Sequence, residues 1–390
     1  MISVEAATER LLSLVSPLPS EPVPLRRAAG RVLAAPVVAA HPMPPFDASA
    51  MDGYAVAGDA RPGASFEVIG EAAAGSPFAG RVGPGRAVRI FTGAVLPPGT
   101  DRVVIQEDVT RDGARITVGP APEASRYVRP AGMDFEAGFT LAPPRALGAR
   151  DVALLAAMGA AEVEVARRPA VALVMSGDEL RPPGAPLAPG EIPASNGPAL
   201  AAMLAAAGAT CHQLPTARDT PESLAQAFAL AASTDLVITL GGASVGDHDL
   251  VADAARTAGF DLRFETVAMR PGKPVMAGPS ASQVMVGLPG NPVSTMVCGV
   301  VFILPMLRRM QGLDPVVAPE PLPLAAPLPA NGPRRHYMRA TTGPDGVTAF
   351  ARQDSNLLRD LAFADRLVVR PPHAPPAAPG EVVETIPLPG

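Results

Sequence analysis

From Arg168 onward, continuous apolar segments alternate with segments of helical periodicity, and this alternation restricts the fold more than any other feature of the sequence. The pattern predicts strands at 171–175, 211–214, 236–240, 263–267 and 284–286, and helices at 198–207, 221–232, 249–258 and 293–307. Apolar strands joined by helices are typical of a mostly parallel sheet covered on both faces. In such sheets ligands bind at the carboxyl ends of the strands, so functional residues are expected there.

The rest of the chain follows different patterns. These patterns predict further domains before and after an α/β domain at 168–317. Residues 46–138 contain short β-type runs broken by Gly and Pro, which indicate a β-rich insertion domain. Residues 1–45 and 139–167 then form one split N-terminal domain for linkage and dimerisation. Residues 318–390 begin with a Pro-rich stretch and continue in short β runs, which predict a small C-terminal β-barrel. The expected fold class is multidomain α/β plus β, in keeping with a length of 390 residues.

Composition excludes several classes of protein. A net charge of −5 argues against electrostatic binding of nucleic acid. Cys211 and Cys298 lie far apart without a CxxC motif, which excludes a zinc cluster or a disulfide framework. The first residues lack the features of a signal peptide. The apolar stretch 293–307 is interrupted by Gly299 and Pro305 and is shorter than the ~20 residues of a membrane span. We therefore expect a soluble, cytoplasmic protein with neither a nucleic acid nor a membrane partner.

Three polar or Gly-rich loops follow predicted strands, at 176–179, 241–249 and 287–294. Such loops present backbone N–H groups at helix N-termini, which suits phosphate. The second loop is neither a P-loop nor a GxGxxG dinucleotide motif. One loop of this kind is more often a tight turn, but three at one edge of a sheet favour a binding site. Its predicted members are Ser176, Gly177, Asp178, Gly241, Gly242, Ser244, Gly246, Pro289, Gly290, Asn291 and Pro292.

Acidic residues are expected at the same edge of the sheet. They are Glu179, Asp219, Asp247 and Asp249. Carboxylates beside a phosphate site typically hold Mg²⁺. The alternative is a structural role, because Asp219 and Asp249 lie where helices are predicted to begin, and acids stabilise helix N-termini.

The segment 270–274, Arg-Pro-Gly-Lys-Pro, holds two cations in a turn stiffened by proline. Arg270 and Lys273, fixed three residues apart, suit a small oxyanion, and a solvated turn is the alternative. The five histidines show no metal-ligand spacing, and the sequence spells no Ser-His-Asp or Cys-His set.

Taken together, these loops resemble the molybdopterin molybdenumtransferases, the MoeA family that includes the E domain of gephyrin. The strings MDGYA, SGDEL, GG-x-S-x-G-x-x-D and GLPGNP are jointly very specific for it. The matching segments occur in family order and cover almost the whole chain: 46–55, 92–94, 132–134, 176–180, 241–249, 270–274, 287–294, 334–339 and 353–355.

The resemblance implies an elongated homodimer whose active cleft lies between the α/β domain of one subunit and the β insertion of the other. It implies Mg²⁺ as cofactor, adenylylated molybdopterin and molybdate as substrates, and molybdenum cofactor and AMP as products. By motif, the acids for metal and pyrophosphate are Glu179, Asp219 and Asp249. The residues that resemble the oxyanion pocket are Arg270, Lys273, Pro274, Arg339 and Ser355. Those expected to reach in from the partner subunit are Asp52, Thr92 and Asp134. The preceding adenylyltransferase and acceptor molybdoenzymes are the expected protein partners.

The chain departs from the family pattern at two positions. Arg270 stands where the family commonly has Lys. A planar guanidinium group therefore replaces the compact ammonium charge of lysine. Ala194 stands where the family often has an acid, so a ligand contact made by that acid is not expected here. Two alternative functions remain. One is the adenylyltransferase of the preceding step, whose single domain resembles residues 168–312 without the β insertion and the C-terminal domain. The other is a binding scaffold, since the gephyrin E domain also anchors a receptor peptide.

Overall fold

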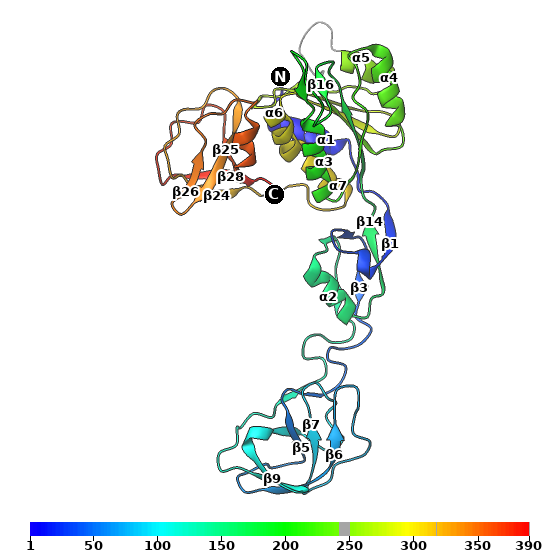
Figure 1. Ribbon diagram of the computed structural model, residues 1–390, viewed down its shortest axis with the longest axis vertical. Helices are drawn as coiled ribbons and strands as arrows, with labels where there is room; N and C mark the ends of the chain where they lie inside the picture. Colours follow the sequence, from blue (N-terminus) through cyan, green and yellow to red (C-terminus); the bar gives the residue numbers. More distant parts are fainter. Residues whose placement is uncertain (242–249, 317, 390) are drawn as a thin grey trace.

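The computed structural model describes residues 1–241, 250–316 and 318–389 and shows an elongated chain (Figure 1). Its α/β part and its C-terminal β part lie side by side at one end. The split N-terminal part lies in the middle, and the β-rich insertion lies at the other end. One chain therefore holds its insertion away from its own α/β part.

A six-stranded sheet with the order β18-β15-β19-β23-β22-β20 forms the centre of the α/β part. Its strands are β15 (Ala170–Met175), β18 (Thr210–Gln213), β19 (Leu236–Leu240), β20 (Phe264–Thr266), β22 (Pro274–Pro279) and β23 (Val284–Leu288). The first four strands in this order pair in parallel. Strand β22 pairs antiparallel with both of its neighbours, so the sheet is mixed.

The sequence does not predict strand β22, because Pro274, Gly278 and Pro279 resemble turn residues. The two prolines are tolerated because they lie at the ends of the strand, where fewer ladder hydrogen bonds are needed. Since β22 runs opposite to β23, with Met276 opposite Gly287, its first residue lies at the edge where β23 ends. The turn before β22 therefore reaches the carboxyl edge of the parallel strands.

Helices cover both faces of this sheet. They are α1 (Val4–Ser13), α3 (Asn196–Ala206), α4 (Pro221–Leu230), α5 (Leu250–Thr257), α6 (Pro292–Cys298) and α7 (Leu304–Met310). Alternate residues of β19 enter different cores. Leu236, Ile238 and Leu240 pack with residues of α1, α3, α6 and α7. Val237 packs on the other face with residues of α4 and α5.

The last core helix is longer than predicted. It runs from α6 through a π-helical turn, η3 (Gly299–Ile303), into α7, so Gly299 and Pro305, which interrupt the apolar stretch in sequence, lie within one helix as predicted. The π turn shifts the hydrogen-bond pattern just before Pro305, which lacks an N–H donor. Residues Pro292–Met310 are long and apolar enough to pass for a membrane span by composition, but 67% of the most apolar window is buried inside the protein. Core packing accounts for this composition.

The split N-terminal part is a four-stranded sheet with the order β1-β14-β2-β13. Strands β1 (Ser20–Pro24) and β2 (Val32–Leu33) precede the insertion in sequence, and β13 (Arg145–Ala146) and β14 (Glu162–Ala166) follow it. Helix α2 (Ala149–Ala157) contributes Leu155 to the core of this part. Asp235, next to β19, accepts hydrogen bonds from both terminal nitrogens of Arg167 at 3.0 and 2.7 Å, which ties this part to the α/β sheet.

The insertion contains a six-stranded sheet with the order β8-β5-β7-β6-β10-β9. Its strands are β5 (Gly53–Val56), β6 (Ser65–Ala72), β7 (Arg86–Ile90), β8 (Arg102–Ile105), β9 (Val109–Asp112) and β10 (Arg115–Val118). Two short ribbons lead into it. They pair β4 (Ala48–Ser49) with β11 (Val128–Arg129), and β3 (Val37–Val38) with β12 (Thr140–Leu141).

The C-terminal sheet has the order β21-β25-β27-β28-β24, with β26 also paired to β25. Its strands are β21 (Met269–Arg270), β24 (Glu320–Pro323), β25 (Arg335–Gly343), β26 (Gly346–Ala349), β27 (Arg366–Arg370) and β28 (Val382–Pro387). A bridge between Leu324 and Val347 brings the ends of the sheet together, so the sheet curls on itself. Strand β21 comes from the α/β part, so the two parts are hydrogen-bonded to each other directly before the Arg270–Pro274 turn.

Candidate active site

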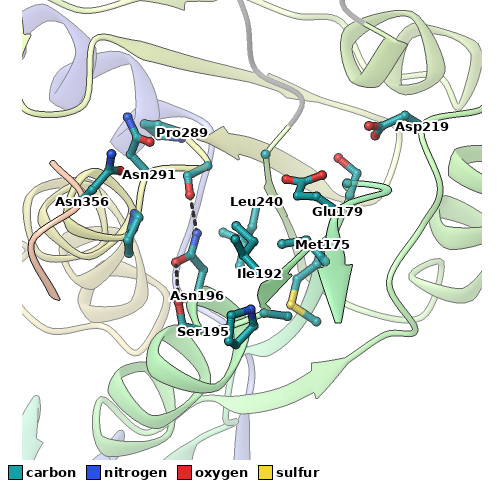
Figure 2. A pocket seen from close by; sticks show the side chains of 18 of the residues that line it. Met175, Glu179, Ile192, Ser195, Asn196, Asp219, Leu240, Pro289, Asn291 and Asn356 are labelled. Atoms are coloured by element: carbon teal, nitrogen blue, oxygen red, sulfur yellow. Dashed lines mark hydrogen bonds between the residues drawn. The ribbon is translucent and has the colours of Figure 1, made fainter. Parts of the chain in front are cut away.

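A cleft of about 580 Å³ opens at the carboxyl edge of the α/β sheet (Figure 2). It joins the loops that follow β15, β19 and β23 to the turn before β22. The predicted site residues that line it are Ser176, Gly177, Glu179, Asp219, Gly241, Lys273, Pro274, Pro289, Gly290, Asn291 and Pro292. Asp178, Arg270, Arg339 and Ser355 are described residues that lie outside its lining. Gly242, Ser244, Gly246, Asp247 and Asp249 fall outside the described residues.

Loop backbones approach one another closely at this edge. Gly241 has φ +93°, and a Cβ on it would lie 2.8 Å from the Ser176 carbonyl oxygen. A Cβ on Gly290 would lie 3.4 Å from the Gly241 Cα. Glycine is needed at position 241, where φ is positive and the two backbones meet. Within residues 1–241, 250–316 and 318–389, the buried Ser176 Oγ beside them has no hydrogen-bond partner, and such a group at a cleft wall favours a site that a ligand completes.

Carboxylates gather on one side of the cleft, where Figure 2 shows Glu179 and Asp219. Burial, followed by the charges of Asp178 and Glu179, raises the pKa of Asp219. A divalent cation relieves such repulsion, and Mg²⁺ commonly takes one or two carboxylates and completes its shell with water and phosphate oxygens. The described residues contain no group of three or more acid, His or Cys side chains arranged to hold a metal. Glu179 and Asp219 thus fit a shared Mg²⁺ site rather than a cage made by protein alone.

Lys273 lines the cleft and is the only lysine of the chain. The turn that carries it packs on helix α6, because Gly272 has φ +104° and a Cβ there would lie 2.5 Å from Cys298 Sγ. Burial raises the pKa of the Cys298 thiol, which therefore acts as a neutral packing group. A single lysine retained in an arginine-rich chain is a signal for this site that is independent of the loop motifs.

The Pro289–Pro292 loop is held from two sides. Asn196 Nδ2 of α3 donates to the Gly290 carbonyl at 2.7 Å. From the C-terminal part, Ser355 Oγ accepts a hydrogen bond from Asn291 Nδ2 at 3.1 Å. Asn356, which the sequence did not single out, follows Ser355 and lines the cleft. Ser355 therefore contacts a wall of the cleft, and its neighbour reaches the cleft itself.

Arg339 is the most deeply buried of the predicted cations, with 1% of its surface exposed. Its guanidinium donates to Gln353 Oε1 and to the carbonyls of Leu357 and Arg352 at 3.3, 3.1 and 3.2 Å. Burial lowers its pKa. In the single chain, these contacts fix the segment that carries Ser355 and Asn356. Arg339 therefore supports the Ser355–Asn356 wall of the cleft without lining the cleft itself.

The predicted residues of the insertion lie away from the cleft of their own chain. Asp52 Oδ1 accepts hydrogen bonds from the Thr92 backbone N and Oγ1, both at 2.8 Å. The backbone bond, followed by the hydroxyl bond, lowers the pKa of Asp52. Arg89 lies over the Tyr54 and Phe91 rings, 5.1 and 4.7 Å from their centroids. The backbone N of Asp134 donates to the Met43 carbonyl at 2.9 Å. Figure 1 places β5 and β7, which flank this group, at the end opposite the α/β part.

An apolar wall of the cleft was not predicted. The short strands β16 (Leu180–Arg181) and β17 (Ile192–Pro193) pair in parallel, and Leu180, Ile192 and Pro193 line the cleft. Met175 and Leu240 complete its apolar lining. Ala194, where the family often has an acid, is buried in this wall. Two-residue strands have no periodicity to detect, so the sequence contains no signal for this wall.

Family models match consecutive parts of the chain. The MoeA N-terminal region (domain I and II) matches residues 2–159, a probable molybdopterin binding domain matches residues 172–309, and the MoeA C-terminal region (domain IV) matches residues 321–388. The first and third models cover the insertion and the C-terminal part, which the single-domain adenylyltransferase lacks. This organisation argues against that alternative.

Individual proteins agree with the family models. A molybdopterin molybdenumtransferase of Nostoc sp. is 38% identical over 328 residues, which cover 80% of this chain and 75% of that protein. Molybdopterin molybdenumtransferase 2 of Mycobacterium tuberculosis is 36% identical over 370 residues, 89% of each chain. The crystal structure of a molybdopterin biosynthesis MoeA protein from Pyrococcus horikoshii is 30% identical, covers 100% of both chains and has a TM-score of 0.83. The chain therefore belongs to the MoeA family of molybdopterin molybdenumtransferases, and it is a transferase of molybdenum cofactor biosynthesis.

Proposed function

We propose that the protein inserts molybdate into adenylylated molybdopterin and releases AMP in a Mg²⁺-dependent reaction, the last general step of molybdenum cofactor synthesis. The observation that carries this proposal is one cleft that combines Glu179 and Asp219 with Lys273 around glycine-rich loops. Molybdate is a tetrahedral dianion, so its binding needs a fixed cation. Cleavage of a phosphoanhydride needs charge neutralisation and in-line positioning more than a strong base.

The lining of the cleft supports separate subsites. The loop backbones at Gly241 and Gly290 suit the phosphates, and Lys273, the cation that lines the cleft, suits molybdate. The apolar wall around Ile192 suits the planar pterin. Glu179 and Asp219 would hold Mg²⁺, which when bound neutralises charge on the phosphate oxygens.

We propose further that Asp52, Thr92 and Asp134 complete the cleft of a second copy in a homodimer. The elongated chain supports this, because it separates these residues from its own cleft. Apolar side chains near them are exposed, namely Phe46 (39%), Met51 (42%) and Met133 (68%), and such a face favours cover by a partner. A cytoplasmic location, and contact with the preceding adenylyltransferase and with acceptor molybdoenzymes, belong to the same proposal.

Purified protein tests the reaction directly. Incubation with adenylylated molybdopterin, molybdate and Mg²⁺ should release AMP in step with cofactor formation, and omission of molybdate should suppress AMP release. Substrate binding without AMP release under all conditions would instead identify a binding scaffold.

Mixing two inactive variants tests the shared site. Asp52→Asn and Glu179→Gln subunits, each inactive alone, should together regain about a quarter of the wild-type activity, because half of the dimers are mixed and each mixed dimer has one intact site. Subunit exchange is verified by native mass spectrometry. Mixed dimers without activity would contradict completion of the cleft by a second copy.

Gly272→Ala tests the support of Lys273. The added Cβ clashes with Cys298 Sγ and the backbone is strained at φ +104°, so the molybdate concentration for half-maximal rate should rise roughly tenfold, as expected for about 1–3 kcal/mol of local strain. Gly312→Ala is the matched control, since Gly312 also has positive φ (+80°) but nothing within 4 Å of its Cβ position. If both variants change molybdate dependence equally, the turn has no special role.

A further inference from the structure

Cationic side chains cross the C-terminal sheet outside the cleft. Arg270, His336 and Arg370 are register partners on the neighbouring strands β21, β25 and β27. Arg334 precedes His336 by two residues. Register partners lie on the same face of a sheet, on strands about 4.8 Å apart. We call these four residues the cation row.

Two buried nitrogen atoms of the cation row have no hydrogen-bond partner among the residues that the structure describes. They are His336 Nε2 and Arg370 Nε, in residues with 7% and 6% of their surface exposed. Polar groups close to these nitrogens already make hydrogen bonds to other partners. Arg370 Nη2 donates to the Pro375 carbonyl, and Asn331 Nδ2 donates to the carbonyls of Arg334 and Arg370 at 2.9 and 3.0 Å. Buried polar atoms in proteins nearly always have partners, so two unpaired nitrogens in one row indicate a missing acceptor.

The charge of the row is also uncompensated. Within the part of the chain that the structure describes, Arg270, Arg334 and Arg370 form no ion pair with an acid, whereas the neighbouring Arg335 and Arg366 pair with Glu5 and Glu320. Burial, followed by the charges of Arg270, Arg334 and Arg339, lowers the pKa of His336 to about 4. Its imidazole is therefore neutral at pH 7. Cations gathered without a counter-charge destabilise one another, and a bound anion offsets this cost.

We propose that the cation row binds a small tetrahedral oxyanion of the sulfate, phosphate or molybdate class at a site separate from the cleft. Guanidinium groups present planar sets of donors that match such anions, and a neutral imidazole can add one hydrogen bond. The anion must be small, because the unpaired nitrogens belong to side chains that are more than nine-tenths buried. This site does not depend on the transferase reaction proposed above.

Equilibrium dialysis of the full chain tests the site, with molybdate, sulfate and phosphate measured separately. The background is Lys273→Ala, which removes the cation of the cleft. We expect at least one of the three anions to saturate at about one ion per subunit, and the order of affinities identifies the ligand. Arg334→Ala and His336→Leu should each weaken this binding at least tenfold, on the scale of one lost charge-assisted or buried hydrogen bond.

Arg359→Ala is the matched control, because Arg359 is an exposed arginine of the same C-terminal part. Arg334 is half-buried, so its variant keeps the test valid even if His336→Leu unfolds.

NMR gives a second readout: the anion stabilises the imidazolium and should raise the pKa of His336 while the other four histidines stay unchanged. Three results would overturn the site. They are no saturable binding of any anion, loss of all binding in Lys273→Ala itself, and equal binding by Arg334→Ala and Arg359→Ala. None of them bears on AMP release, which is measured independently.

Discussion

Glu179→Gln is expected to lower Mg²⁺-dependent AMP release roughly a hundredfold or more. The carboxylate lines the cleft beside Asp219, whose pKa is raised by burial and by the charges of Asp178 and Glu179. The amide keeps the shape of the side chain but removes the charge that would hold the cation. Loss of one group that stabilises transition-state charge commonly costs about 10²–10³ in rate.

The measurement is AMP release at increasing Mg²⁺, with the oligomeric state of the variant compared with that of the wild type by sedimentation. Glu222→Gln is the matched control, because Glu222 is an exposed acid at the start of α4 in the same α/β part and does not line the cleft. It should retain wild-type release. Near-normal release by Glu179→Gln at low Mg²⁺ would remove Glu179 from the metal site.

Lys273→Ala is expected to raise the molybdate concentration for half-maximal rate roughly ten- to hundredfold. One charge-assisted contact contributes about 1.5–3 kcal/mol, and about 1.4 kcal/mol corresponds to a tenfold change. Binding of adenylylated molybdopterin should change much less, since its phosphates are assigned to the glycine-rich loops. Excess molybdate should therefore restore much of the rate in Lys273→Ala but not in Glu179→Gln.

Two further comparisons sharpen this test. Lys273→Arg keeps the charge and should give an intermediate effect. Because Lys273 is the only lysine, reductive methylation with labelled formaldehyde gives one side-chain NMR signal besides the N-terminus, and molybdate should shift it. If Lys273→Ala instead weakens binding of the nucleotide-pterin and leaves molybdate dependence unchanged, the two subsites are assigned the wrong way round.

The sequence by itself determined the chemistry of the cleft and much of the α/β part. Continuous apolar strands such as Val171–Met175 must be buried on both faces, so their periodicity and the loops that follow them are enough to place Ser176, Gly241 and Gly290 at one edge of the sheet. Loop motifs are local in sequence, so their residue types and spacing identified the family without knowledge of the fold.

Only the tertiary structure decided which candidates meet. Strand β22 reverses direction, and this reversal brings Lys273 to the carboxyl edge of the parallel strands. Arg339 is buried and donates hydrogen bonds to the segment that carries Ser355. The Asp52–Thr92 pair, next to β5 and β7, lies at the far end of the elongated chain. The pairing of β25 with β27 likewise makes His336 and Arg370 register partners, although they lie far apart in sequence. These features depend on contacts between residues far apart in sequence, and the local pattern of side chains carries no information about such contacts.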